Sequence, residues 1–137
     1  MGIFNKLFSK TNVTPEFDFI KSYKYRDKYF SRTKQWTWLN PEQISLIEKD
    51  ENGKIKMTTM EYWSQEMFLD ADGQVTISDY LNVLIKQFKD SKMKIPKDLD
   101  EFMTEKLWSL KTDLHAIEFT DSPNMLQPEF KNPINKN

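Results

Sequence analysis

An apolar stripe that begins at residue 77 constrains the fold of this chain more than any other feature of its sequence. Its members recur at helical spacing and share one helical face: Ile77, Tyr80, Leu81, Leu84, Ile85 and Phe88. Thr76, with Asp79 three positions later, resembles a capping box, which marks the start of a helix. Because such a face has to be buried against other elements, the sequence predicts a helix over residues 76–90 that packs on a core.

A second helix is predicted to begin at Pro96, because proline is favoured in the first helical turn. We expect it to span residues 96–114. Its buried face is expected to consist of Leu99, Phe102, Met103, Leu107, Leu110 and Leu114. The apolar stretch 115–119 then predicts a short closing strand. Residues 120–137 contain three prolines and are expected to form an extended or mobile tail, pinned in part by Met125, Leu126 and Phe130.

Residues 23–69 carry the β signal. Trp36 and Trp38 alternate as in a strand, and two β-prone runs flank Asn52-Gly53. That dipeptide favours a tight two-residue hairpin turn in which both central positions have positive φ. The alternative is a helix that begins near Pro41 and ends at Gly53. Residues 17–29 fit a helix and a strand equally well.

The chain length of 137 residues, with 38% hydrophobic and 14% aromatic residues, suits a single compact domain. We predict an α+β fold in which a small antiparallel sheet or hairpin packs against two amphipathic helices, in a winged-helix-like arrangement. Residues 1–119 are expected to form the domain, and 120–137 its proline-containing tail. A short amphipathic helix is predicted at the N-terminus, either packed on the domain or docked elsewhere, from Ile3, Phe4, Leu7 and Phe8.

The stretch FLDADGQVTIS at 68–78 resembles a calcium loop. With Gly73 at the sixth position, Asp70 and Asp72 occupy ligand positions three and five. Phe68, however, occupies the first ligand position, and the side chain of Asp79 at the twelfth is too short for the bidentate contact that glutamate supplies. The residues before the loop also read as a strand rather than as an entering helix. We therefore predict a turn followed by the Thr76 helix cap, without a metal.

The composition excludes several kinds of functional site. The chain has no cysteine, one histidine (His115) and three glycines, so thiolate zinc sites, cysteine nucleophiles and phosphate-cradling loops are excluded. No pair of carboxylates is marked out by its spacing. We predict no catalytic residue, no metal, no cofactor and no enzymatic activity. No run approaches the ~18 apolar residues of a membrane span, and the absence of cysteine and of an apolar leader predicts a cytoplasmic protein.

The charges are distributed unevenly, with +5 over residues 1–38 and −6 over the rest of a chain whose net charge is −1. The segment 21–38 interleaves cations with aromatic rings. If the rings face outward, this segment binds a partner; if they face the core, only the cations reach water. The residues predicted to bind a partner are Tyr25, Tyr29, Arg32, Lys34, Trp36 and Trp38.

The stretches DGQVTISDYLNVLIKQF (72–88) and DLDEFMTEKLWSLKTDLHAIEF (98–119) are similar to the pattern of PqqD-like winged-helix modules. The resemblance covers about residues 55–119. It implies a β-hairpin packed on a helical bundle that holds a peptide along a sheet edge. The chain departs from the family in having one long helix in place of two shorter ones. It also lacks the usual glycine near the final turn, where Asp113 and His115 stand instead.

These observations predict a non-catalytic, cytoplasmic protein-binding module, such as an adaptor or a small inhibitor or immunity-type protein. The alternative is a winged-helix-like protein that binds nucleic acid through segment 21–38. Against the alternative, the second predicted helix carries Asp98, Asp100, Glu101 and Glu105 against Lys97, Lys106 and Lys111, whereas a helix that reads a DNA groove is usually more basic. The identity of the partner and the oligomeric state are left open.

Overall fold

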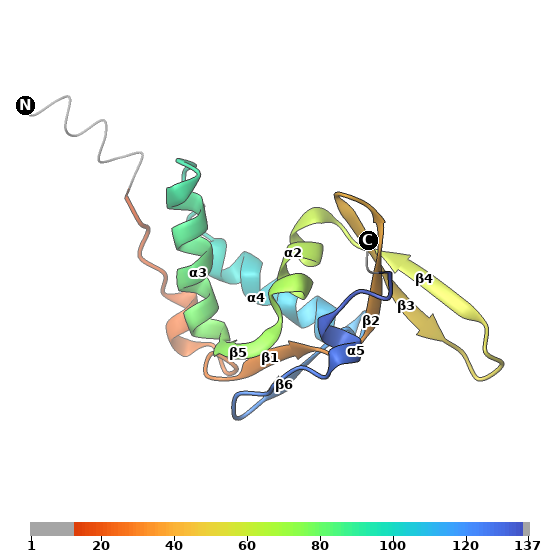
Figure 1. Cartoon of the computed structure of the whole chain (residues 1–137). Coiled ribbons are helices and arrows are strands. Elements are labelled where there is room, and N and C mark those ends of the chain that lie inside the picture. Colours follow the sequence, from red (N-terminus) through yellow and green to blue (C-terminus); the bar gives the residue numbers. More distant parts are fainter. Residues whose placement is uncertain (1–12, 136–137) are drawn as a thin grey trace, which may run out of the picture.

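The computed structural model describes residues 13–135 (Figure 1). Its elements, in chain order, are the 3-10 helix η1 (Phe19–Ser22), the strands β1 (Tyr29–Arg32), β2 (Gln35–Asn40), β3 (Gln43–Lys49) and β4 (Ile55–Thr59), helix α2 (Tyr62–Asp70), strand β5 (Asp72–Thr76), helices α3 (Ile77–Asp90) and α4 (Leu99–Thr112), strand β6 (Ile117–Thr120) and helix α5 (Pro128–Lys131). This is an α+β fold, as the sequence predicted.

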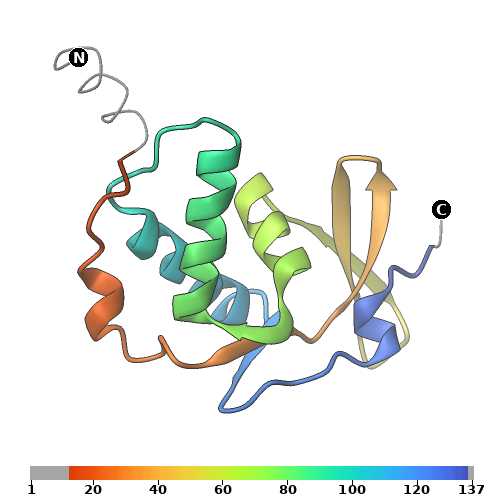
Figure 2. The same cartoon turned by 60° about the vertical axis from the view of Figure 1, so that its left-hand side comes forward.

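The strands form two separate antiparallel sheets. The first has the order β5-β1-β6 and the second the order β2-β3-β4. The chain passes from the first sheet to the second where β1 runs on into β2. Helices α2, α3 and α4 each contact a strand of the first sheet, and the β3–β4 hairpin projects away from the helices (Figures 1 and 2).

The two predicted amphipathic helices are confirmed. In α3 the buried side chains are Ile77, Tyr80, Leu81, Leu84 and Phe88. The Thr76 cap is also confirmed, because its hydroxyl accepts the backbone N–H of Asp79 at 3.1 Å. Helix α4 buries Leu99, Met103, Leu107 and Leu110, while Leu114 lies beyond its end. Both apolar faces therefore point into a common core, as their spacing requires.

The predicted hairpin is confirmed as β3–β4, and the alternative helix over 41–53 is wrong. The predicted turn type is also wrong. Gly53 has φ +79°, but the non-glycine residues with positive φ in 13–135 are Lys92 and His115, so Asn52 is not left-handed. Instead, the Asp50 carboxylate accepts the N–H groups of Asn52 at 2.9 Å and Lys54 at 2.8 Å. These bonds, with Gly53 left-handed, give a longer turn closed by a glycine bulge.

Helix α2 corrects the predicted β segment 23–69, whose last part is helical. The cap of this helix is Glu61, whose carboxylate accepts the N–H groups of Trp63 at 3.1 Å and Ser64 at 2.7 Å. Its buried face includes Gln65, whose amide bonds the backbone of Ile44 and Glu42 and so joins α2 to β3. A polar residue on the buried face weakens the helical periodicity, which is why the pattern did not reveal this helix.

Glu61 supplies a pH-dependent contribution to stability. Burial opposes its ionisation, but hydrogen bonds from Ser64, Lys106 and the Trp63 N–H outweigh burial and lower its pKa to about 2. A depressed carboxyl pKa stabilises the fold above the unfolded value of 4.5, and this contribution is lost as pH falls from 4.5 towards 2. With its side chain 48% exposed, we expect solvent screening to limit the contribution to about 1 kcal/mol.

Urea unfolding of the wild type and of Glu61→Gln measures this contribution. The gap between their free energies of unfolding is expected to shrink as pH is lowered through that window. A gap of constant size across the window would show that ionised Glu61 does not cap α2 more strongly than an amide does.

The aspartate-glycine stretch does not form the predicted turn. Residues 72–76 are the strand β5, which pairs with β1. Gly73 has φ +77°, a conformation that L-residues rarely adopt. The backbone of Asn124 lies directly against it, and the Asn124 N–H donates to the Gly73 carbonyl at 2.9 Å. A segment about fifty residues further along the chain therefore covers this strand, which the sequence alone did not indicate.

The C-terminal segment, residues 124–135, is held to both sheets by polar contacts. The Ile134 N–H donates to the Trp36 carbonyl at 2.9 Å, and the Asn135 side chain bonds the Trp38 backbone at 3.0 and 2.9 Å. Of the three residues expected to pin it, Phe130 and Leu126 are half-buried and Met125 is exposed. The predicted N-terminal amphipathic helix lies outside the described residues. No helix within 13–135 is long and apolar enough to cross a bilayer.

Candidate functional site

Two of the six predicted partner-binding residues are interior. Arg32 is 7% exposed and Trp36 is 5% exposed. The Arg32 guanidinium donates to four backbone carbonyls: those of Leu69 and Phe130 at 2.7 Å, Lys131 at 3.2 Å and Ala71 at 3.3 Å. The Trp36 indole N–H also donates to the Phe130 carbonyl, at 3.0 Å. In this structure both side chains join the C-terminal segment to the domain, and neither is exposed to a partner.

Three more of the predicted residues pack against or bond to other parts of the domain. Lys34 forms an ion pair with Glu48 and donates to the Leu114 carbonyl at 2.5 Å. Trp38 is half-buried and lies edge-on to the ring of Trp36. Tyr29 is half-buried in the central strand β1. Most of segment 21–38 therefore follows the second reading of the sequence, in which the rings pack and the cations are held at the surface.

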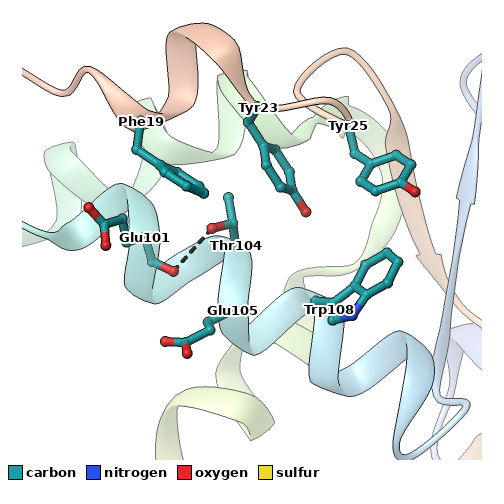
Figure 3. Close-up of a pocket in the computed structure, with 7 residues that line it drawn as sticks. All are labelled: Phe19, Tyr23, Tyr25, Glu101, Thr104, Glu105 and Trp108. Atoms are coloured by element: carbon teal, nitrogen blue, oxygen red, sulfur yellow. Dashed lines mark hydrogen bonds between the residues drawn. The ribbon is translucent and has the colours of Figure 1, made fainter.

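Tyr25 is the exception, because it lines an open groove between the η1 segment and α4. Its ring stacks on Trp108 with centroids 5.4 Å apart and an angle of 18°. Figure 3 shows the rings of Phe19, in η1, and of Tyr23 and Tyr25, in the chain that follows η1, pointing towards α4. The groove has a volume of about 510 Å³, and α4 contributes its Glu101, Thr104, Glu105 and Trp108. We call this the aromatic groove.

A buried carboxylate holds the two walls of the aromatic groove together. Asp100, which is buried, accepts the backbone N–H of Ile20 at 3.1 Å and so fixes η1 against the start of α4. Tyr23 packs between Phe19 and Tyr25, with ring centroids 5.6 and 5.7 Å away. Its burial in this row, with a smaller effect of Tyr25, raises the pKa of the Tyr23 hydroxyl.

The rim of the aromatic groove carries negative charge. Glu101 and Glu105 lie one turn apart on α4, and both are exposed. Within residues 13–135 no ion pair or hydrogen bond engages either carboxylate. The nearby Lys21 is already paired with Glu16 and Asp18. Aromatic rings beside two carboxylates that no described residue engages suit a cationic group, which ring faces and carboxylates both attract.

The sequence did not single out Glu101, Glu105 or Trp108, although a signal was present. These residues recur at i, i+4 and i+7, on the helical face that the apolar stripe of α4 leaves free. A tryptophan on the solvent face of an amphipathic helix has no core to fill, so it indicates a contact surface. Phe19 and Tyr23 could not be placed beside them, because only the fold brings η1 and α4 together.

The two aspartates that resembled calcium ligands are engaged within the protein. The Asp70 carboxylate accepts the Tyr80 hydroxyl at 2.7 Å, and the Asp72 carboxylate accepts the Gln74 N–H at 3.0 Å. In the part of the chain that the structure describes, no group of three or more His, Cys, Asp or Glu side chains has the arrangement of a metal site. His115 adopts φ +51° just after α4, and its carbonyl accepts the Thr33 hydroxyl at 3.2 Å.

Comparison of the chain with models of protein families, with curated protein sequences and with solved structures gives no match. The similarity to PqqD-like winged-helix modules therefore stays a prediction from the sequence.

Proposed function

We propose that this protein is a non-catalytic protein-binding module whose aromatic groove receives a cationic segment of another protein. The observation that carries the proposal is that the carboxylates of Glu101 and Glu105, which no ion pair or hydrogen bond within residues 13–135 engages, lie in a groove lined by aromatic rings. The adaptor and the small inhibitor or immunity-type protein remain the classes that we propose for it. A cytoplasmic location is part of the same proposal.

Exposed aromatic area supports binding at this surface. Phe19 is 41% exposed and Trp108 is 40% exposed, and both line the aromatic groove. Large rings that the core does not cover are the residues that most often dominate the affinity of a protein interface. The rings are also fixed before binding, because Tyr25 stacks on Trp108 and Asp100 holds η1 in place. A groove that is already formed loses little entropy when a partner enters it.

Charge determines which partner the groove suits. Arginine and lysine side chains stack on aromatic faces and pair with carboxylates, so a basic peptide segment satisfies both features. A nucleic acid brings phosphates, which Glu101 and Glu105 repel. The cations of segment 21–38 are also partly committed, since Lys28 pairs with Asp121 and Arg32 is buried. No observation in the fold favours the nucleic-acid alternative.

Peptide binding tests the proposal. We expect an unstructured decapeptide with two arginines to shift the amide and indole NMR signals of Trp108. The same peptide with citrulline in place of arginine should bind at least several-fold more weakly. Glu101→Gln and Glu105→Gln are each expected to weaken the arginine peptide about three- to tenfold, the loss of one charge-assisted contact. Glu51→Gln, which removes an exposed carboxylate from the distant β3–β4 turn, is the matched control and should change nothing.

Three results would overturn the proposal. The first is equal binding of the arginine and citrulline peptides, and the second is a set of shifts that map away from the aromatic groove. The third concerns the chain's own N-terminus, which carries Lys6 and Lys10 among apolar residues. If a full-length Lys6→Gln, Lys10→Gln variant bound the arginine peptide tenfold more tightly, the groove would serve the chain itself rather than a partner.

A further inference from the structure

A second, smaller cavity lies between α2 and α3, apart from the aromatic groove. Its volume is about 220 Å³. Its lining includes four aromatic side chains and two carboxylates: Tyr62, Trp63, Tyr80 and Phe88, with Glu66 and Asp70. Figure 2 shows the two helices that contribute these residues side by side. We call this cavity the α2–α3 pocket.

The aromatic walls are packed into a fixed arrangement. Trp63 stacks on Phe88 with centroids 5.8 Å apart and an angle of 16°, and Tyr62 stands edge-on to Trp63 at 5.3 Å. Phe88 is buried in the core face of α3, so its ring cannot turn away. The ring of Tyr80 is buried as well, and its hydroxyl is held by Asp70 at 2.7 Å. Contacts within the protein therefore hold the aromatic walls in place.

The two carboxylates give the pocket a negative charge, which Arg32 offsets in part through Asp70. Glu66 and Asp70 lie one turn apart on α2, so both reach the same side of the helix. In residues 13–135 no ion pair or hydrogen bond engages the Glu66 carboxylate, and Asp70 has the hydroxyl of Tyr80. Burial raises the pKa of Glu66, and the charge of Asp70 adds to this effect. Burial also raises the pKa of Asp70, although Tyr80 and Arg32 act in the opposite direction.

We propose that the α2–α3 pocket binds a small organic cation, a primary or quaternary alkylammonium group, with the nitrogen near Glu66 and Asp70 and the alkyl part against Trp63 and Phe88. Ring faces attract such cations most strongly when water is excluded, and carboxylates that burial has partly desolvated gain most from a positive charge. The inference goes beyond the proposed function, because it concerns different residues on different helices and a ligand rather than a peptide segment.

The size and the lining of the pocket set the ligand class. A volume of about 220 Å³ is below the ~300–1,000 Å³ of sites for drug-sized ligands, so the pocket suits a group of few atoms. Calcium and magnesium require about six oxygen ligands, whereas two carboxylates and a tyrosine hydroxyl among rings offer fewer. A quaternary ammonium needs no such shell, and a primary ammonium needs only acceptors for its three N–H groups. Anions are excluded by the charge of the two carboxylates.

Titration with choline and its neutral isostere, 3,3-dimethylbutan-1-ol, tests the proposal, because the two differ essentially in charge. We expect choline to bind with a Kd on the order of 1 mM and to shift the Trp63 indole signal in NMR spectra. The neutral alcohol should bind at least tenfold more weakly. n-Butylammonium represents a free amine, and Nα-acetyl-lysine amide represents a lysine of another protein. Tighter binding of one of these two identifies the source of the cation.

Glu66→Gln is expected to weaken choline binding about tenfold and to leave the binding of the neutral alcohol unchanged. Tyr62→Ala, at an exposed position that should tolerate truncation, is expected to weaken choline several-fold. Glu51→Gln is again the control. Melting curves confirm that each variant is folded. Equal affinity for choline and the alcohol, or choline shifts confined to Trp108, would overturn the inference. Glu66→Gln should leave the arginine peptide bound as before, so the two proposals can fail separately.

Discussion

Gly73→Ala is expected to lower the free energy of unfolding by about 3 kcal/mol, one of the largest losses for a single methyl group in this chain. Gly73 has φ +77°, which costs any L-residue about 1–2 kcal/mol. The added methyl group would also overlap the Asn124 carbonyl oxygen and lie 3.3 Å from the Asn124 Cβ. Both contacts are with the backbone or the Cβ of Asn124, which cannot rotate away as the end of a side chain can. The C-terminal segment therefore has to move. Urea unfolding measures the loss.

Gly53→Ala is the matched control for this prediction. Gly53 has φ +79°, but no atom of residues 13–135 lies within 4 Å of the position of an added methyl group. The control variant therefore has the conformational cost alone, about 1–2 kcal/mol. The difference between the two variants isolates the contact with Asn124. Faster hydrogen exchange of the Asn124 and Ile134 amides should accompany Gly73→Ala only. If both variants lost the same free energy of unfolding, the contact between the C-terminal segment and β5 would contribute nothing to stability.

Arg32→Met is expected to destabilise the fold by about 3–4 kcal/mol, because four backbone carbonyls lose their donor at once. Arg32→Lys should recover part of this loss, since an ammonium keeps the charge but cannot reproduce the planar fork that reaches both α2 and the C-terminal segment. Denaturant unfolding, read by tryptophan fluorescence, is suited to the measurement because Trp36 shares the Phe130 carbonyl with Arg32.

Arg26→Met supplies the comparison for Arg32. Arg26 is exposed and donates to the Tyr23 carbonyl at 3.2 Å, so its loss should cost less than about 0.5 kcal/mol. Similar effects at the two positions would contradict the structural role of Arg32. The double variant Arg32→Met, Gly73→Ala should be less destabilised than the sum of the single changes, because both act through the same C-terminal segment.

The parts of this fold that sequence reasoning predicted are those with local signals. The apolar stripe from Ile77 to Phe88 has one period over three turns, and the β3–β4 turn contains a glycine where a left-handed residue is needed. Helix α2 was missed because Glu61 is a less usual cap than serine or aspartate, and because the buried Gln65 interrupts the stripe. In that helix the polar contacts of Gln65 with β3 add to the burial of Met67 and Phe68.

The candidate sites were less predictable, because chain stretches far apart in sequence build them. The partners of Arg32 at Phe130 and Lys131 are backbone carbonyls, which leave no residue-type signature. Alternating rings and cations in segment 21–38 look the same whether the rings face a partner or the core. Only the fold shows that Trp36 is buried and that Tyr25 stacks on Trp108 at the edge of the aromatic groove. The α2–α3 pocket needed α2, and so could not be anticipated without it.

The hydrogen bonds that join residues 124–135 to both sheets affect how the molecule unfolds. The two sheets share no strand, and such an architecture in principle permits two separate melting transitions. Here one stretch of chain is bonded to Gly73 in the first sheet and to Trp36 and Trp38 in the second. Heating should therefore produce one calorimetric peak, with equal van't Hoff and calorimetric enthalpies. A chain cleaved after Thr120 keeps the contacts of Gln65 with β3 but loses the C-terminal segment, so its peak should broaden and its van't Hoff enthalpy should fall below the calorimetric one.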